Sequence, residues 1–191
     1  MKILDEQQLK FFLEVAKKDK YWLYFKLACV TGARINELLA LEWEDMDFKN
    51  KLVRISKQVQ HEIGVKDYII TTKTGKGRNI QLGDNTINDI LEYRELTQSS
   101  SGLIFKKISG EFVNPCCIRN HFFRILNDCN LPRIRIHDLR HTAVSIMLNN
   151  NVPVTIVSEI LGHSSINTTL TVYAHAIPNQ QYKATEIMDN F

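Results

Sequence analysis

The sequence predicts an α+β protein that is mostly α-helical and carries one small three-stranded antiparallel sheet. Apolar residues recur at helical spacing up to Trp43 and again from Asn88 onward. Between these two parts the chain changes to short apolar runs separated by glycines, which is typical of strands and turns. No linker-like stretch divides the 191 residues, so we expect one domain over residues 1–191.

The first part predicts three helices. Residues 4–18 form an amphipathic pattern, with Asp5 placed to cap the helix. Residues 21–30 are apolar nearly all round and predict a buried helix, which Thr31-Gly32 breaks. Residues 33–43 predict a third helix because apolar residues again follow helical spacing, namely Ile35, Leu38, Leu39 and Trp43.

The middle part predicts three strands, over residues 51–56, 66–72 and 78–82. Gly75 and Gly77 indicate a tight turn between the last two strands. This arrangement would place two lysines, Lys73 and Lys76, at the tip of a hairpin.

The last part returns to helices, with a short apolar stretch at residues 102–105. The predicted helical segments are 88–96, 114–129, 137–150, 153–162 and 167–175. Pro153 suits the first turn of a helix, and Gly162 suits a C-terminal cap.

Composition bounds the class of protein. The hydrophobic fraction of 44% and the charged fraction of 24% are typical of a globular chain and argue against disorder. The net charge of +3 permits a nucleic-acid partner without indicating one. No signal peptide and no long apolar run is present, so we expect a soluble cytoplasmic protein without a membrane partner.

The cysteines do not indicate a disulfide framework or a zinc site. No CxxC spacing occurs among the four residues, which are Cys29, Cys116, Cys117 and Cys129. We therefore expect reduced, mostly buried thiols, and neither a cofactor nor a metal ion.

The stretch RIHDLRHTAV, residues 135–144, concentrates charge at the start of a helix. On that helix His137, Arg140 and His141 share a face, and Val144 continues the same face as an apolar one. The charge therefore lies at the helix N-terminus, just before the helix becomes buried on both sides. Two kinds of partner remain open, acidic side chains such as Asp138 or Glu37 and a bound anion such as a phosphate.

Three other segments carry polar residues in a suggestive order. Arg34 begins a helix with Glu37 one turn later, at ion-pair spacing. Lys73 and Lys76 lie in TTKTGKGRN, and LGH at His163 precedes Tyr173 by ten residues. Each alone has an ordinary reading, as a surface ion pair, a charged turn, or a packed tyrosine near a loop histidine.

Taken together in order and spacing, these segments resemble the catalytic domain of the tyrosine recombinases, the phage integrase family, from about Leu4 to Tyr173. The resemblance rests on TGARINELLALEW, TKTGKGRNIQL, HDLR, LGH and TTLTVYAH. It implies that the catalytic residues are Arg34, Lys73 (with Lys76 as the competing choice), His137, Arg140, His163 and Tyr173, supported by Glu37. One departure is IQLGD, where the family often has a proline after the strand.

The resemblance implies a metal-independent strand transfer on double-stranded DNA. In it Tyr173 attacks a phosphodiester and forms a 3′-phosphotyrosyl link, and the two arginines grip the phosphate. It further implies self-association on DNA, as a tetramer in the full-length synapse, and accessory DNA-bending or directionality proteins. The family usually carries an N-terminal DNA-clamping domain, so we expect a fragment or truncated form that lacks it.

Three alternatives stay open. A type IB topoisomerase would use the same chemistry to relax DNA, and a module of the same fold could bind DNA without cleaving it. A metal-dependent hydrolase would use His137, His141 and His163, although clustered carboxylates are missing. Residues 180–191 carry apolar side chains at helical spacing, and we expect this tail to pack on its own domain or on a neighbouring subunit.

Overall fold

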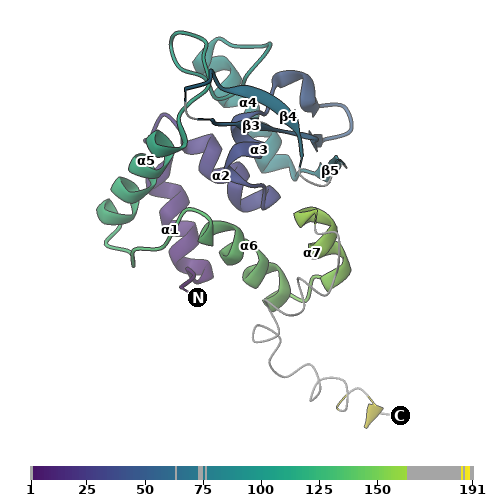
Figure 1. The fold of residues 1–191 in the computed structure, drawn as a ribbon. Coiled ribbons are helices and arrows are strands. Elements are labelled where there is room, and N and C mark those ends of the chain that lie inside the picture. The colour runs from purple at the N-terminus through teal and green to yellow at the C-terminus, as the bar shows by residue number, and fades with distance from the viewer. Residues whose placement is uncertain are drawn as a thin grey trace.

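The computed structural model describes residues 2–62, 64–72, 75, 77–162, 186, 188 and 189. Its helices are α1 (Glu6–Ala16), α2 (Trp22–Thr31), α3 (Ile35–Leu39), the 3-10 helix η1 (Trp43–Asp45), α4 (Asp84–Thr97), α5 (Pro115–Asp128), α6 (Asp138–Asn149) and α7 (Val154–Leu161). Its strands are β1 (Met46–Asp47), β2 (Leu52–Ile55), β3 (Lys57–Gln60), β4 (Tyr68–Thr71) and β5 (Arg78–Gln81). The mostly helical α+β class predicted from the sequence is confirmed (Figure 1).

Helix α2 lies at the centre of the helical part and contacts α1, α3, α4 and α6 (Figure 1). This confirms the prediction of a buried helix, since an all-round apolar sequence has no face to present to water. Aromatic rings fill the space between α1, α2 and α5, where Phe12, Phe25 and Phe122 pack with centroid distances of 5.4–6.0 Å. Asp5 caps α1 as predicted, by accepting a hydrogen bond from the backbone of Gln8.

The predicted sheet exists, but its strands are partly different. The three-stranded sheet has the order β1-β2-β5, and β4 pairs instead with β3 in a separate two-stranded sheet. Strands β1 and β3 were not predicted, because a two-residue strand and the polar sequence KQVQ give no clear period-2 signal.

Strands β4 and β5, which flank the lysine segment, do not pair with each other. Ile55 pairs with Arg78 and Lys57 pairs with Thr71, so β4 and β5 follow one another along the same neighbouring chain. Strand β4 thus forms an antiparallel pair with β3, and the segment between β4 and β5 includes residues outside the described part of the chain. The predicted pairing of residues 66–72 with residues 78–82 is therefore wrong, because β4 and β5 pair with different strands. The placement of Lys73 and Lys76 at a hairpin tip concerns residues outside the described part of the chain.

The predicted helix over residues 33–43 is shorter than expected, because tertiary pairing overrides its helical periodicity. Helix α3 ends at Leu39, and the chain then runs beside the apolar stretch 102–105. The amide of Ile104 donates to the carbonyl of Leu41 at 2.9 Å, and the amide of Trp43 donates to the carbonyl of Gly102 at 3.0 Å. These bonds fix the backbone in a form that a helix cannot adopt.

Helix α7 lies against α6 and β5, which places its C-terminus beside the sheet (Figure 1). Gly162 ends α7 in the left-handed conformation, with φ of 64°, as predicted for a C-terminal cap. The predicted helix at residues 167–175 lies outside the described residues, as does the tail apart from residues 186, 188 and 189. None of the described helices has the length and apolar character needed to cross a membrane.

The aromatic core determines which face of α1 is buried. Substitutions at two adjacent phenylalanines, one buried and one exposed, test this orientation. Phe12 is fully buried, whereas Phe11 is 46% exposed. We expect Phe12→Ala to reduce the free energy of unfolding by about 3–5 kcal/mol, since it opens a cavity between α1, α2 and α5. Phe11→Ala is the matched control and should cost less than about 1 kcal/mol in the same denaturant titration. Equal reductions in the free energy of unfolding would contradict this orientation of α1.

Candidate active site

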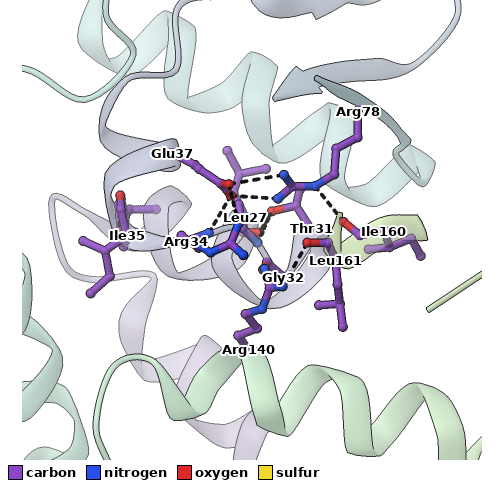
Figure 2. A network of polar contacts seen from close by, with 12 residues as sticks. Leu27, Thr31, Gly32, Arg34, Ile35, Glu37, Arg78, Arg140, Ile160 and Leu161 are labelled. Atoms are coloured by element: carbon purple, nitrogen blue, oxygen red, sulfur yellow. Dashed lines mark hydrogen bonds and ion pairs between the residues drawn. The ribbon is translucent and has the colours of Figure 1, made fainter. Parts of the chain in front are cut away.

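Two helices end side by side and direct their terminal carbonyls at arginine side chains. Helix α2 ends at Thr31 and is capped by Gly32, and α7 ends at Leu161 and is capped by Gly162. The guanidinium of Arg140, from the first turn of α6, donates to the carbonyl of Gly32 and to that of Leu161, the latter at 2.9 Å (Figure 2). Arg140 is 5% exposed, and these carbonyls carry the negative end of each helix dipole, so they offset the cost of burying its charge.

A glycine is required at position 32 for two reasons. Its φ of +56° is a conformation that residues with a side chain rarely adopt. A Cβ atom there would also lie 2.8 Å from Cδ2 of Leu161. A side chain at position 32 would therefore be strained and would force Leu161 to shift at the place where the ends of α2 and α7 hold Arg140.

The carboxylate of Glu37 is buried between two arginines. Glu37 is 1% exposed. Its Oε1 accepts from Nη1 of Arg34 at 2.9 Å, and its Oε2 accepts from the backbone amide of Arg34 at 2.8 Å (Figure 2). On its other side Nη2 of Arg78 donates to Oε2 at 2.8 Å and Nη1 donates to Oε1 at 3.3 Å. Glu37 therefore binds one arginine from the start of α3 and one from β5.

The two arginines around Glu37 differ in exposure. The side chain of Arg34 is 36% exposed and that of Arg78 is 9% exposed. Within the described part of the chain, Nε and Nη2 of Arg34 donate to no protein group. Arg78 is held at a third nitrogen as well, since its Nε donates to the carbonyl of Ile160 at 2.8 Å. Arg34 can therefore reach an external anion, whereas Arg78 faces inward.

His137 lies at the N-terminus of α6, beside the arginine cluster. Its ring is 5.1 Å from that of His141, edge to face. Partial shielding from water, and then the positive charges of Arg140, Arg135 and Arg34, lower the pKa of His137 below its ordinary value, while Asp138 opposes this shift. His137 is therefore neutral at pH 7 and can accept a proton.

Comparison with known proteins decides the family. The family model described as the phage integrase family matches residues 2–180. The chain belongs to the phage integrase family. A tyrosine recombinase XerC-like protein of Caldanaerobacter subterraneus is 28% identical over 97% of this chain and 53% of its own length. The ICEBs1 integrase of Bacillus subtilis is 24% identical over 100% of this chain and 55% of its own length, so the chain spans about half the length of these curated relatives.

Solved structures agree with this assignment. The Tn1549 transposon integrase, in complex with transposon right end DNA, superposes with a TM-score of 0.86 at 25% identity, covering 98% of this chain and 66% of that one. The catalytic domain of bacteriophage HP1 integrase shares the fold, with a TM-score of 0.68 at 20% identity, covering 97% of this chain and 94% of that one. The fold is therefore that of the integrase catalytic domains.

The structure brings together some of the integrase residues predicted from the sequence. The predicted Arg34–Glu37 pair is confirmed, and Arg140 lies at the same cluster. Glu37 and Asp138 were possible internal partners for the charge at the start of α6. Asp138 does pair with Arg135 of this stretch, at 2.8 Å, whereas Glu37 binds Arg34 and Arg78, and Arg140 donates to carbonyls.

Four predicted residues, Lys73, His163, Tyr173 and the competing Lys76, lie outside the described residues. The residues beside them are described. Thr72 and Gly77 bound the lysine segment next to Ser56, and Gly162 directly precedes His163. Strand β5, which follows the lysine segment, contacts α7, which precedes His163, so the described residues that border these two segments lie close together.

Sequence reasoning missed Arg78. It lies at the end of the quoted TTKTGKGRN segment, where a charged side chain next to glycines reads as a solvated turn. The available signal was the alternation RNIQL, which places Arg78 on the same side of the strand as the buried Ile80. An arginine on a buried face requires hydrogen-bond acceptors, and for Arg78 these include the carboxylate of Glu37.

The residues that could hold a metal do not gather in the described part of the chain. There, no group of three or more histidine, cysteine, aspartate or glutamate side chains has a suitable arrangement. His163, the third ligand of the hydrolase alternative, lies outside the described residues. All four cysteines are free thiols, with Cys29 and Cys129 buried, Cys117 partly buried and Cys116 exposed.

The need for glycine at position 32 can be tested by comparing its substitution with that of another glycine of positive φ, Gly110. Gly32→Ala combines a left-handed φ with a clash against Leu161, whereas Gly110→Ala has φ of +81° and nothing within 4 Å. The left-handed conformation alone costs about 1–2 kcal/mol. We expect Gly32→Ala to lower the melting temperature clearly more than Gly110→Ala, because only it separates the two helix ends. Equal melting temperatures would show that the contact with Leu161 is not close.

The lowered pKa of His137 can be tested through Arg135, one of the charges that cause it. Arg135→Gln removes that charge and leaves Asp138 without its partner, and both effects should raise the pKa of His137 in a ring-proton NMR titration. Because the pKa in the folded state lies below the unfolded value of about 6.5, protonating His137 destabilises the fold as the pH falls below that value. Arg133→Gln, two residues away, is the control. A pKa that falls or stays constant in Arg135→Gln would contradict this account.

Proposed function

We propose that this chain is the catalytic domain of a site-specific DNA recombinase, which cuts and rejoins one strand of double-stranded DNA through a covalent 3′-phosphotyrosyl intermediate. The observation that carries the proposal is a cluster of three arginines, in which Arg34 and Arg78 bind the buried carboxylate of Glu37 and Arg140 is held nearby by the carbonyls of Gly32 and Leu161. Three guanidinium groups and one carboxylate leave an excess of positive charge, and Arg34 is exposed enough to meet a phosphate.

The arginines supply the electrostatic part of the reaction. Arg34 and Arg140 stabilise the charge on the non-bridging phosphate oxygens as the transition state forms. The hydroxyl oxygen of Tyr173 attacks phosphorus, its proton passes to neutral His137, and the bond from phosphorus to the 5′ oxygen breaks. Lys73, rather than Lys76, donates the proton that the leaving 5′ oxygen takes up, and His163 hydrogen-bonds the phosphate.

Rejoining reverses these steps with a second strand. The 5′-hydroxyl of that strand attacks the phosphotyrosyl phosphorus and releases Tyr173, so the bond energy is kept and no ATP is needed. We further propose that the transfer is independent of metal ions, because guanidinium groups provide the positive charge that Mg²⁺ supplies in other phosphoryl transfers.

The partner in this proposal is double-stranded DNA, on which copies of the catalytic domain, residues 1–191, assemble as a tetramer with accessory DNA-bending or directionality proteins. The Tn1549 integrase and the XerH recombinase, whose folds this chain shares, were both solved with DNA bound. A type IB topoisomerase would use the same chemistry, and joining of two different duplexes, rather than relaxation alone, separates the two activities.

The nucleophile provides the direct test of the proposal. The probe is a pool of short duplexes with randomised centres, each nicked a few nucleotides beyond the cleavage position so that the released fragment diffuses away and the adduct persists. We expect covalent protein–DNA adducts with the unchanged chain in excess EDTA, and none with Tyr173→Phe, because the phenylalanine variant lacks only the attacking oxygen. Adducts are measured by denaturing gel and sequenced to recover the site.

Tyr68→Phe is the matched control, since Tyr68 is exposed and donates its hydroxyl hydrogen bond to Glu62, away from the cluster. It should form adducts at the rate of the unchanged chain. Adducts that persist in Tyr173→Phe would assign the nucleophile elsewhere, and adducts that vanish in EDTA would refute metal independence.

A further inference from the structure

The carboxylate of Glu37 is shared unequally between its two arginines. Arg78 grips it with both terminal nitrogens, whereas Arg34 uses one terminal nitrogen and its backbone amide. A two-point contact between guanidinium and carboxylate is stronger and better oriented than a single one. Arg78 is therefore the principal counter-ion of Glu37.

Arg78 is held in this position by the backbone around it. Its Nε donates to the carbonyl of Ile160, so three of its nitrogens are engaged at once. Its side chain also passes against the backbone of Gly162, where an added Cβ would lie 2.9 Å from Cδ of Arg78. At 9% exposure Arg78 has little access to solvent or to a large ligand.

The titration of Glu37 is consistent with this division. Burial alone would raise its pKa, but the hydrogen bonds and charge of Arg78, followed by the amide and charge of Arg34, lower the pKa below its ordinary value. Glu37 therefore carries a full negative charge at neutral pH, and that charge lies 2.9 Å from the guanidinium of Arg34.

We propose that Arg78 is a positioning residue for the proposed reaction: it takes up the charge of Glu37, so that the exposed guanidinium of Arg34 keeps its positive charge and its orientation for a phosphate. This inference rests on the proposed function. Without Arg78, Glu37 has only Arg34 as a cationic partner among the described residues and draws it inward into a neutral pair. Arg78 thus acts on the phosphate through two intervening side chains.

This mechanism predicts that Glu37→Gln restores the adduct formation that Arg78→Met reduces. Arg78→Met removes the counter-ion and leaves the buried carboxylate, so adduct formation should fall by about tenfold or more. Adding Glu37→Gln removes the unbalanced charge, so the double variant should regain activity to within about threefold of Glu37→Gln alone. Arg78→Lys keeps the charge without the two-point grip and should lie between Arg78→Met and the unchanged chain.

A second readout separates this role from a loss of structure. The slope of log affinity against log salt concentration on a short duplex counts phosphate contacts, at about 0.9 per contact. Arg78→Met should reduce the slope by about one contact, as should Arg34→Met, and combining the two should reduce it no further. All measurements are made well below each variant's melting temperature, so that the protein is folded.

The control is Arg54→Met. Arg54 is exposed on β2, next to Ile55, the residue that pairs with Arg78, and therefore on the opposite face of the sheet. It is expected to form adducts at the rate of the unchanged chain.

Three outcomes overturn the inference. These are normal adduct rates in Arg78→Met, a double variant less active than Arg78→Met, or an unchanged salt slope in Arg78→Met beside a reduced one in Arg34→Met. The salt slope does not depend on cleavage. If the unchanged chain binds DNA but forms no adducts, the proposed function is refuted. The salt slopes then still test the role of Arg78.

Discussion

The arginine cluster depends on the ion pairs of Glu37. A carboxylate that is 1% exposed would cost several kcal/mol if it were left without partners, so the fold must bring donors to it. Those donors come from the start of α3 and from β5, and Arg78 of β5 lies 41 residues from Glu37 in the sequence. The packing of the helical part against the sheet is therefore coupled to the geometry of the cluster, because Glu37 is satisfied only when both are in place.

The ends of α2 and α7 compensate for the burial of Arg140. A guanidinium that is only 5% exposed needs acceptors, and the last carbonyls of a helix have no partner within the helix itself. The carbonyls of Gly32 and Leu161 supply these acceptors without adding a carboxylate. Arg140 is thereby fixed while its full charge remains, which a second buried acid would have cancelled.

Contacts between residues that are near in the sequence could be predicted from it, whereas contacts between residues far apart in the sequence were missed. The Arg34–Glu37 pair follows from three-residue spacing on one helix, and the cap at Gly162 follows from glycine chemistry, so both could be read directly. The contact of Arg78 with Glu37 depends on how β5 approaches α3, which no local pattern encodes. The same reason explains why the helix predicted over residues 33–43 ends early, since pairing with residues near Ile104 is a tertiary effect.

The connections of Arg78 also relate the described cluster to the segments that carry the remaining predicted residues. Arg78 begins β5 directly after the lysine segment, and its Nε is bonded to the carbonyl of Ile160, three residues before His163. One guanidinium thus ties together the start of α3, the exit of the lysine segment and the end of α7. Stabilising a developing charge on phosphate requires donors that are already in place before the reaction begins, because reorienting them would consume the energy gained. For the proposed reaction, the ionic contacts of Arg78 meet this requirement, and they do so from a position that no phosphate needs to touch.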